Sequence, residues 1–164
     1  MITPLFARLF GGRAKTVIGM IHVRALPGTP QHAGGMVPIL DHALAEAETY
    51  RACGIHALMV ENMHDLPYVQ HPGPEIATAM AVVARAVKQA HPHLPLGLQI
   101  LAGANREALS AALAAGADFI RAEAFVFGHV ADEGYMDSCA GALLRHRKAI
   151  GAEAIAVFTD IKKK

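Results

Sequence analysis

Short apolar runs alternate strictly with longer alanine-rich segments along this chain, and no other feature constrains its fold as much. The apolar runs predict strands over residues 17–22, 57–61, 96–101, 119–123 and 154–160. Between them, apolar residues at helical spacing predict helices over residues 37–52, 74–90, 106–115 and 135–150. Alternation of this kind predicts parallel strands, because a helix must carry the chain back before the next strand begins.

Three of the predicted helices end in a similar way, directly before a strand. The segments CGIHALMV, AGADFIRA and IGAEAIAV place Gly54, Gly116 and Gly151 at this turn. Glycine suits the left-handed conformation that follows a helix, because it has no Cβ to clash there. The predicted starts also agree: Pro74 occupies a first-turn position, and the side-chain oxygen of Asn105 is expected to cap its helix. One βα module is therefore expected to recur.

The composition is that of a folded domain with a large core. Hydrophobic residues make up 53% of the 164 residues and charged residues 18%, and the mean hydropathy is +0.30. A formal net charge of +1 argues against binding to nucleic acid or to an anionic membrane surface. No apolar run reaches the roughly 18 residues of a membrane span. We expect a small-molecule ligand, with a homo-oligomer as a further option.

Two features bear on the compartment. Cys53 directly follows one predicted helix and Cys139 falls in another, and both are far from any zinc or C-x-x-C spacing, which indicates a reduced, cytoplasmic protein. The segment MITPLFARLFGGRAK carries Arg8, Arg13 and Lys15 without an acidic residue, a weak sign of a mitochondrial transit peptide. The favoured interpretation is a frayed or capping segment. Residues 1–16 are accordingly interpreted as an N-terminal extension.

Polar side chains occur late in each predicted strand or directly after it. Parallel strands are buried on both faces and should be apolar throughout, whereas ligands bind at the carboxyl ends of such strands in open sheets and in barrels. These polar positions therefore predict a binding site at one edge of the sheet. They are His22, Glu61, Asn62, Gln99, Arg121, Glu123 and Asp160.

Structural alternatives apply to several of these residues. Arg121 and Glu123 are two apart on one strand, so they are equally well interpreted as a buried ion pair. Taken alone, His22 is more typical of a histidine buried in the core. Its expected position beside Glu61 and Asp160 is what favours a role in a binding site. A divalent metal held by these three side chains is a further alternative, but no metal-binding spacing occurs in the sequence, and neither a metal nor a cofactor is predicted.

Several segments together resemble the BtpA family: GMIHVRALPGTP, LMVENMHDLP, GADFIRAE, ADEG and IGAEAIAVFTDIKKK. The resemblance extends from about Val17 to the end of the chain. It implies a TIM-type (β/α)8 barrel in a family named after a photosystem I biogenesis factor, whose wider members have no secure biochemical activity. Among the positions singled out by spacing, the family motifs fall on His22, Glu61, Asn62, Arg121 and Asp160, and they add Asp65 and Lys162. The loop LAGANRE departs from the family pattern, so binding by Asn105 is not expected.

Length limits what such a barrel can be. A TIM barrel takes about 250 residues, and the fifth predicted strand ends at residue 160 of 164. The expected architecture is a partial α/β barrel of TIM type, in which residues 17–164 supply the first five strands and four helices. On this interpretation the sequence is a truncated product or an incomplete gene model.

Two functional classes follow. The first is an enzyme-like barrel that binds a small polar ligand, phosphorylated or sugar-like, with His22, Glu61 and Asp160 as catalytic candidates. Its ligand-binding candidates are Asn62, Asp65, Gln99, Arg121, Glu123 and Lys162. The second is a non-catalytic assembly or stability factor, as the resemblance implies, or an inactive truncated product. Fold analogy does not decide between these classes.

Overall fold

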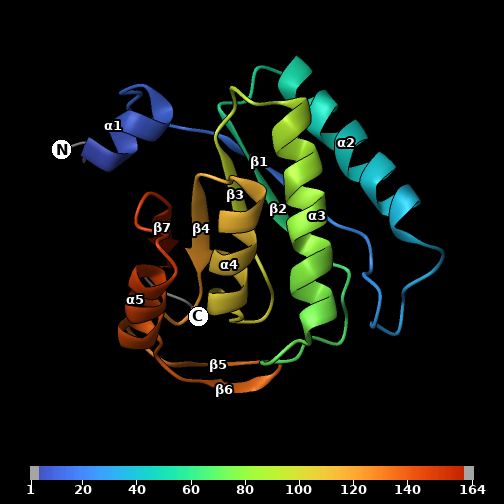
Figure 1. Cartoon of the computed structure of the whole chain (residues 1–164), viewed down its shortest axis with the longest axis vertical. Helices are drawn as coiled ribbons and strands as arrows, with labels where there is room; N and C mark the ends of the chain where they lie inside the picture. The colour runs from blue at the N-terminus through green and yellow to red at the C-terminus, as the bar shows by residue number, and fades with distance from the viewer. Residues whose placement is uncertain (1–3, 161–164) are drawn as a thin grey trace.

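A computed structural model describes residues 4–160 (Figure 1). The helices are α1 (Pro4–Phe10), α2 (Met36–Ala52), α3 (Pro74–Ala90), α4 (Asn105–Ala115) and α5 (Ala140–Ala149). The strands are β1 (Ile18–His22), β2 (Ala57–Glu61), β3 (Leu96–Gln99), β4 (Phe119–Ala122), β5 (His129–Ala131), β6 (Gly134–Met136) and β7 (Ala156–Thr159).

The main sheet of the described residues has five strands in the order β1-β2-β3-β4-β7. Every neighbouring pair in it is parallel, which confirms the prediction from the alternating pattern. The register places His22 opposite Glu61, and Glu61 opposite Gln99. The last residues of these strands therefore form one row across the sheet.

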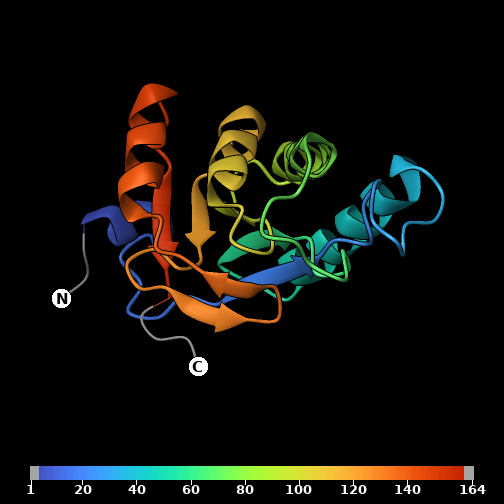
Figure 2. The same ribbon diagram turned by 90° about the horizontal axis from the view of Figure 1, so that it is seen from below.

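The sheet has two different faces. Helices α2 to α5 lie along one face, called the outer face here (Figures 1 and 2). Leu58 and Val60 of β2 pack into the core shared with these helices. Ala57 and Met59 point the opposite way and belong to a separate cluster on the inner face. Because side chains alternate along a strand, Glu61 shares the inner face with them.

Helix α1 closes the amino end of the inner face. Phe10 is 2% exposed, and its ring centroid lies 6.2 Å from that of Phe119 and 6.1 Å from that of Phe158. Gly97 on the neighbouring strand leaves the space for the Phe119 ring, which a Cβ at residue 97 would strike. We call this group the floor cluster; its buried members are Phe10, Ala57, Met59, Phe119 and Ala156.

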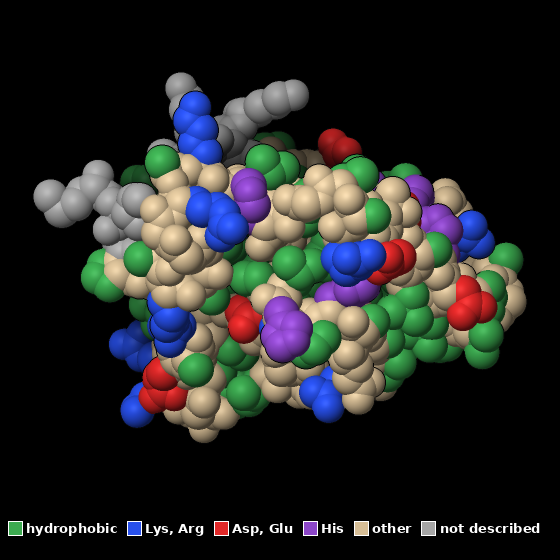
Figure 3. Space-filling model, turned by 90° about the horizontal axis from the view of Figure 1, so that it is seen from above, with side chains coloured by type: hydrophobic (Ala, Val, Ile, Leu, Met, Phe, Trp, Pro, Cys, Tyr) green, Lys and Arg blue, Asp and Glu red, His purple; other side chains and the backbone are tan. Residues whose placement is uncertain are grey.

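Among the described residues, the surface at the amino ends of the strands carries side chains of both charges, without a patch of one sign. Figure 3 views this end and shows lysine, arginine, acidic and histidine side chains scattered among apolar ones. Within residues 4–160, no helix is both long enough and apolar enough to cross a membrane.

Local signals for helix ends are confirmed in part. Gly54, Gly116 and Gly151 have φ values of 75°, 75° and 70°, as the repeated ending predicts, and Pro74 begins α3. The predicted cap by Asn105 is wrong, because Ala104 occupies the N-cap position and the helix begins at Asn105 itself. The side chain of Asn105 makes tertiary contacts instead.

The prediction of a helix over residues 135–150 is also wrong at its start. Residues 129–131 and 134–136 form the antiparallel hairpin β5–β6, and α5 begins only at Ala140. Gly134 has a φ of 102°, a conformation that glycine adopts without strain, and its neighbours Asp132 and Glu133 form the two-residue loop. The hairpin lies across the carboxyl ends of the strands (Figure 2).

Candidate functional site

A row of polar side chains ends the inner face at the carboxyl end of the sheet. By alternation these residues follow the apolar members of the floor cluster and their neighbours: His22 follows Met20, Glu61 follows Met59, and Asp160 follows Phe158. We call this row the rim. Its members are His22, Glu61, Gln99, Arg121 and Asp160.

His22 and Glu61 form the first part of the rim. Nε2 of His22 lies 3.7 Å from Oε2 of Glu61. The side chain of His22 is 46% exposed, whereas that of Glu61 is only 8% exposed. The ring of His64, in the loop between β2 and α3, stands edge-on to His22 with the centroids 6.5 Å apart. A buried carboxylate next to a solvent-accessible imidazole is an arrangement that can exchange a proton with a ligand.

Gln99, Arg121 and Asp160 form the second part. Nε and Nη2 of Arg121 donate to Oδ1 of Asp160 at 3.1 Å and 3.0 Å, and Nη1 donates to Oε1 of Gln99 at 3.3 Å. The other carboxylate oxygen of Asp160 is buried and accepts no hydrogen bond within the described part of the chain.

The rim is continuous along the sheet, but its ends are far apart. His22 belongs to β1 and Asp160 follows β7, and these strands are the two edges of the sheet. Among residues 4–160, no group of three or more His, Cys, Asp and Glu side chains is arranged to hold a metal ion. The alternative of a metal bound jointly by His22, Glu61 and Asp160 is therefore not supported by this arrangement.

Glu123 lies just beyond the end of β4 and is 3% exposed. Its Oε2 accepts a hydrogen bond from the backbone N–H of Gly103 at 3.1 Å. The side chain of Asn105 binds both backbone groups of Glu123. Its Nδ2 donates to the carbonyl of Glu123 at 2.8 Å, and its Oδ1 accepts from the N–H of Glu123 at 3.1 Å. These contacts fix the turn after β4 against the start of α4.

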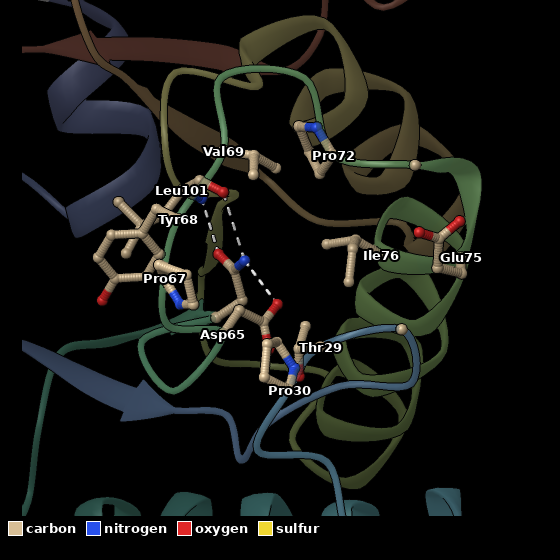
Figure 4. A pocket seen from close by; sticks show the side chains of 13 residues that line it. Thr29, Pro30, Asp65, Pro67, Tyr68, Val69, Pro72, Glu75, Ile76 and Leu101 are labelled. Atoms are coloured by element: carbon tan, nitrogen blue, oxygen red, sulfur yellow. Dashed lines mark hydrogen bonds between the residues drawn. The ribbon is translucent and has the colours of Figure 1, made fainter. Parts of the chain in front are cut away.

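Asn62 and Asp65 join three loops at the carboxyl end (Figure 4). Nδ2 of Asn62 donates to Oδ2 of Asp65 at 2.8 Å, and its Oδ1 accepts from the N–H of Leu101 at 2.7 Å. Oδ1 of Asp65 accepts from the N–H of Leu26 at 2.8 Å. Burial raises the pKa of Asp65 above its ordinary value, although these hydrogen bonds act in the opposite direction.

Two cavities adjoin these residues. The rim cavity has a volume of about 540 Å³ and lies between the rim and the β5–β6 hairpin; it is lined in part by Glu61, Gln99, Arg121, Glu123 and Glu133. The side cavity, of about 210 Å³, lies beside Asn62 and Asp65, with Thr29 and Pro30 on one side and Val69 and Pro72 on the other (Figure 4). Tyr68 and Leu101 line both cavities.

The structure thus brings most of the predicted site residues to one end of the molecule, while Lys162 lies outside the described residues. It also adds contributors that the sequence interpretation missed. Tyr68 lines both cavities, and Glu133 reaches the rim cavity from the hairpin turn. The alternation in HVADEGYM, with its glycine after two acidic residues, is the signal that could have predicted the hairpin.

Comparisons with known proteins agree with this architecture. The model of the BtpA family matches residues 13–164. A Caenorhabditis elegans protein named as uncharacterized and mitochondrial is 52% identical over 163 residues, a match that covers 96% of this chain and 59% of that protein. The photosystem I biogenesis protein BtpA of Synechocystis is 28% identical over 146 residues, covering 88% of this chain and 50% of that protein.

A solved structure with a similar fold is that of 2,3-dimethylmalate lyase, a member of the PEP mutase/isocitrate lyase superfamily. The TM-score is 0.53 at 14% identity, and the match covers 98% of this chain and 54% of the lyase chain. The likeness to this TIM-barrel lyase shows the fold alone. The chain spans between 50% and 59% of the length of the two relatives.

Proposed function

Because the chain belongs to the BtpA family, we propose that its strands are part of a TIM-type barrel that binds a small polar ligand, sugar-like or phosphorylated, at their carboxyl ends. One observation carries this proposal: at the rim end of the inner face, Glu61, Gln99 and Arg121 line a cavity of about 540 Å³. Carboxyl ends of parallel strands are where barrels of this kind hold their ligands.

His22 and Glu61 are the proposed acid and base. Their separation of 3.7 Å is longer than a hydrogen bond, so in this proposal the exposed His22 side chain moves toward Glu61 before a proton passes between them. The exposure of His22 lets it exchange protons with solvent, while Glu61 stays at the buried wall of the cavity. Asp160, the third catalytic candidate, acts in this proposal by orienting Arg121.

The remaining predicted residues are proposed to hold or shape the ligand site. Gln99 and Arg121 present amide and guanidinium groups to the rim cavity, and Glu123 presents a carboxylate. Asn62 and Asp65 keep the surrounding loops in place through their mutual hydrogen bond. Lys162 is proposed to bind the ligand on the strength of the family motif alone.

The barrel itself is part of the proposal. We assign residues 17–164 to the N-terminal part of a (β/α)8 barrel and residues 1–16 to an extension. The greater length of the relatives supports this assignment, as does the fold of the lyase. In that arrangement β1 and β7 would pair with further strands, or with a second copy of the chain. The cytoplasm is the proposed compartment, with the mitochondrion, which appears in the name of the nematode relative, as the alternative.

A second candidate is a role in assembling a protein complex, which the name of the Synechocystis relative favours. The nematode relative is considerably more similar to this chain and comes from an animal, which has no photosystem. A role confined to photosystem I therefore cannot be common to these relatives. Rescue of cells by a folded chain with an inactive rim would favour assembly, whereas failure to rescue would favour ligand chemistry.

The test of the proposed function is a thermal-shift screen of a metabolite library. A ligand present at a hundred times its Kd stabilises the native state by about 2.7 kcal/mol, which raises the Tm by several degrees. We expect Glu61→Gln and His22→Ala to abolish the shift for the active metabolites. His91→Ala, between α3 and β3 at the other end of the strands, is the matched control and should retain it. Equal shifts in all three variants would contradict the proposal.

A further inference from the structure

The lining of the rim cavity is acidic. Glu61 comes from β2, Glu123 follows β4, and Asp132 and Glu133 come from the turn of the hairpin. Among the described residues of this lining, Arg121 supplies the opposite charge. The carboxylates thus reach the cavity from separate parts of the fold.

The positive charge of Arg121 is already engaged. Its guanidinium donates two hydrogen bonds to Asp160 and a third to Gln99. An anionic ligand would have to displace the Asp160 carboxylate or share the guanidinium with it. Since Asp160 holds its own negative charge beside this position, the field of Arg121 is largely cancelled at the cavity.

Backbone donors near the cavity are engaged as well. Phosphate groups are usually bound by unpaired backbone N–H groups in loops or at helix starts. In the loop between β3 and α4, the N–H of Leu101 donates to Asn62, and the N–H of Gly103 donates to the Glu123 carboxylate. The N–H of Asn105 at the start of α4 donates to the carbonyl of Gly103. These groups do not form a phosphate cradle.

Tyr68 lies within reach of the same carboxylates. Its hydroxyl lies at the cavity and donates to the carbonyl of Met63 at 2.7 Å. Burial and the surrounding carboxylates, among them Glu61, Glu133 and Glu123, raise the pKa of Tyr68. Burial disfavours a charge of either sign, whereas the contribution of the carboxylates disfavours an anion and favours a cation.

We propose that the part of the ligand that enters the rim cavity is a cationic nitrogen group, an ammonium or a guanidinium, flanked by hydrogen-bond donors. The carboxylates of Glu61, Glu123 and Glu133 accept these donors, and the phenol ring of Tyr68 offers an apolar wall. A phosphate on the same ligand would bind outside this cavity. This inference rests on the proposed function, because it specifies the ligand of the same site.

The sign of the potential can be measured without knowing the ligand. Ala131→Cys places a thiol on the cavity lining, in a chain that also carries Cys53→Ser and Cys139→Ser. Its reaction rate is compared for a cationic methanethiosulfonate, which bears trimethylammonium, and an anionic one, which bears sulfonate. The ratio of the two rates reports the potential, because the ionisation of the thiol affects both reagents equally.

The matched reference is the native thiol of Cys53, which is exposed at the end of α2, in a chain with Cys139→Ser. Its charged neighbour Arg51 is paired with Glu48. At low salt we expect the ratio of cationic to anionic rates to be about tenfold higher at the cavity than at Cys53. Adding Asp132→Asn and Glu133→Gln should lower it two- to fivefold. A ratio at or below that of Cys53 overturns the inference, and Met63→Cys repeats the measurement from another loop.

Protection of the introduced thiol separates this inference from the proposed function. The named probes are glucosamine, glucose and glucose 6-phosphate, followed by the active metabolites of the thermal-shift screen. We expect cationic compounds to slow modification most. Protection by phosphorylated compounds in preference to cationic ones overturns the charge inference and leaves the proposed site intact. No protection by any compound contradicts both.

Discussion

The two ends of the inner face are built from the same strands and have opposite chemistry. At the amino end, α1 covers the floor cluster with aromatic rings. At the carboxyl end the same strands carry the rim, which is charged and borders a cavity. Phe119 and Arg121 are only two residues apart on β4. A parallel sheet can therefore be stabilised at one end and be left free for ligand chemistry at the other.

The comparison predicts that substitutions at the floor cost stability, whereas substitutions at the rim change binding. Packing at the floor is apolar and closed, so each lost atom leaves a void. Rim groups are partly solvated and keep some of their interactions with water. The predictions below are ordered by the size of the expected effect.

Phe10→Ala should have the largest effect. Removing a ring that is 2% exposed and packed against Phe119 and Phe158 should lower the free energy of unfolding by about 3–5 kcal/mol, measured by urea denaturation. The control is Phe127→Ala, because Phe127 is 77% exposed and its loss should change stability by less than about 0.5 kcal/mol. A cost below about 1 kcal/mol for Phe10→Ala would show that α1 does not close the floor.

Asn62→Ala should come next. The substitution leaves the Leu101 N–H and one oxygen of Asp65 without their partner, which costs roughly 1–3 kcal/mol in the free energy of unfolding. It should also increase hydrogen exchange at Leu101. Gln89→Ala on the exposed side of α3 is the control and should be neutral. Unchanged exchange at Leu101 would argue against a loop-fixing role.

Arg121→Met should lower the free energy of unfolding only slightly but weaken ligand binding strongly. The ion pair with Asp160 is partly exposed, with side-chain exposures of 38% and 21%, so we expect a loss of about 1 kcal/mol or less. Binding of the active metabolites should fall at least tenfold, because Arg121 holds Gln99 and Asp160 in place at the rim. Lys148→Met, which removes an exposed ion pair with Glu153, should alter neither property. A destabilisation as large as that of Phe10→Ala would contradict the contrast between the two ends.

Asp65→Asn should reveal the smallest effect, a dependence on pH. Burial raises the pKa of Asp65 in the folded state, so between the unfolded and folded pKa values the native state binds more protons than the unfolded state. The free energy of unfolding contributed by this group then decreases as pH rises through that window. The wild type should lose more stability than the variant when pH is raised from about 4 upward. A difference that stays constant with pH, measured by urea denaturation, would contradict this sign.

The parts of the fold that sequence could predict are those with local causes. Leu58 and Val60 alternate with Met59 and Glu61 because a strand has a period of two, so the burial pattern of β2 is encoded within five residues. The left-handed conformation of glycines such as Gly116 could likewise be predicted, because it depends on the residue type at one position. The polar row at the rim followed from these strand assignments.

The parts that were missed depend on contacts between distant segments. Spacing allowed Arg121 to pair with Glu123, but in the structure Arg121 forms an ion pair with Asp160, which is 39 residues away. Asparagine is a residue type that favours the N-cap position, but the side chain of Asn105 instead forms hydrogen bonds with the backbone of Glu123. The strands of the hairpin have three residues each, too few for periodicity to distinguish them from the start of a helix.

The most direct test of the central claim, that the carboxyl end of the inner face is the ligand site, is an NMR titration of the whole chain with metabolites from the thermal-shift screen. Amide shifts should change at the ends of β1, β2 and β3 and in the hairpin around Glu133, while the amides of α1 stay unchanged. Shifts concentrated around Arg8, Lys88 and His93, which line a separate cavity at the amino end, would contradict it.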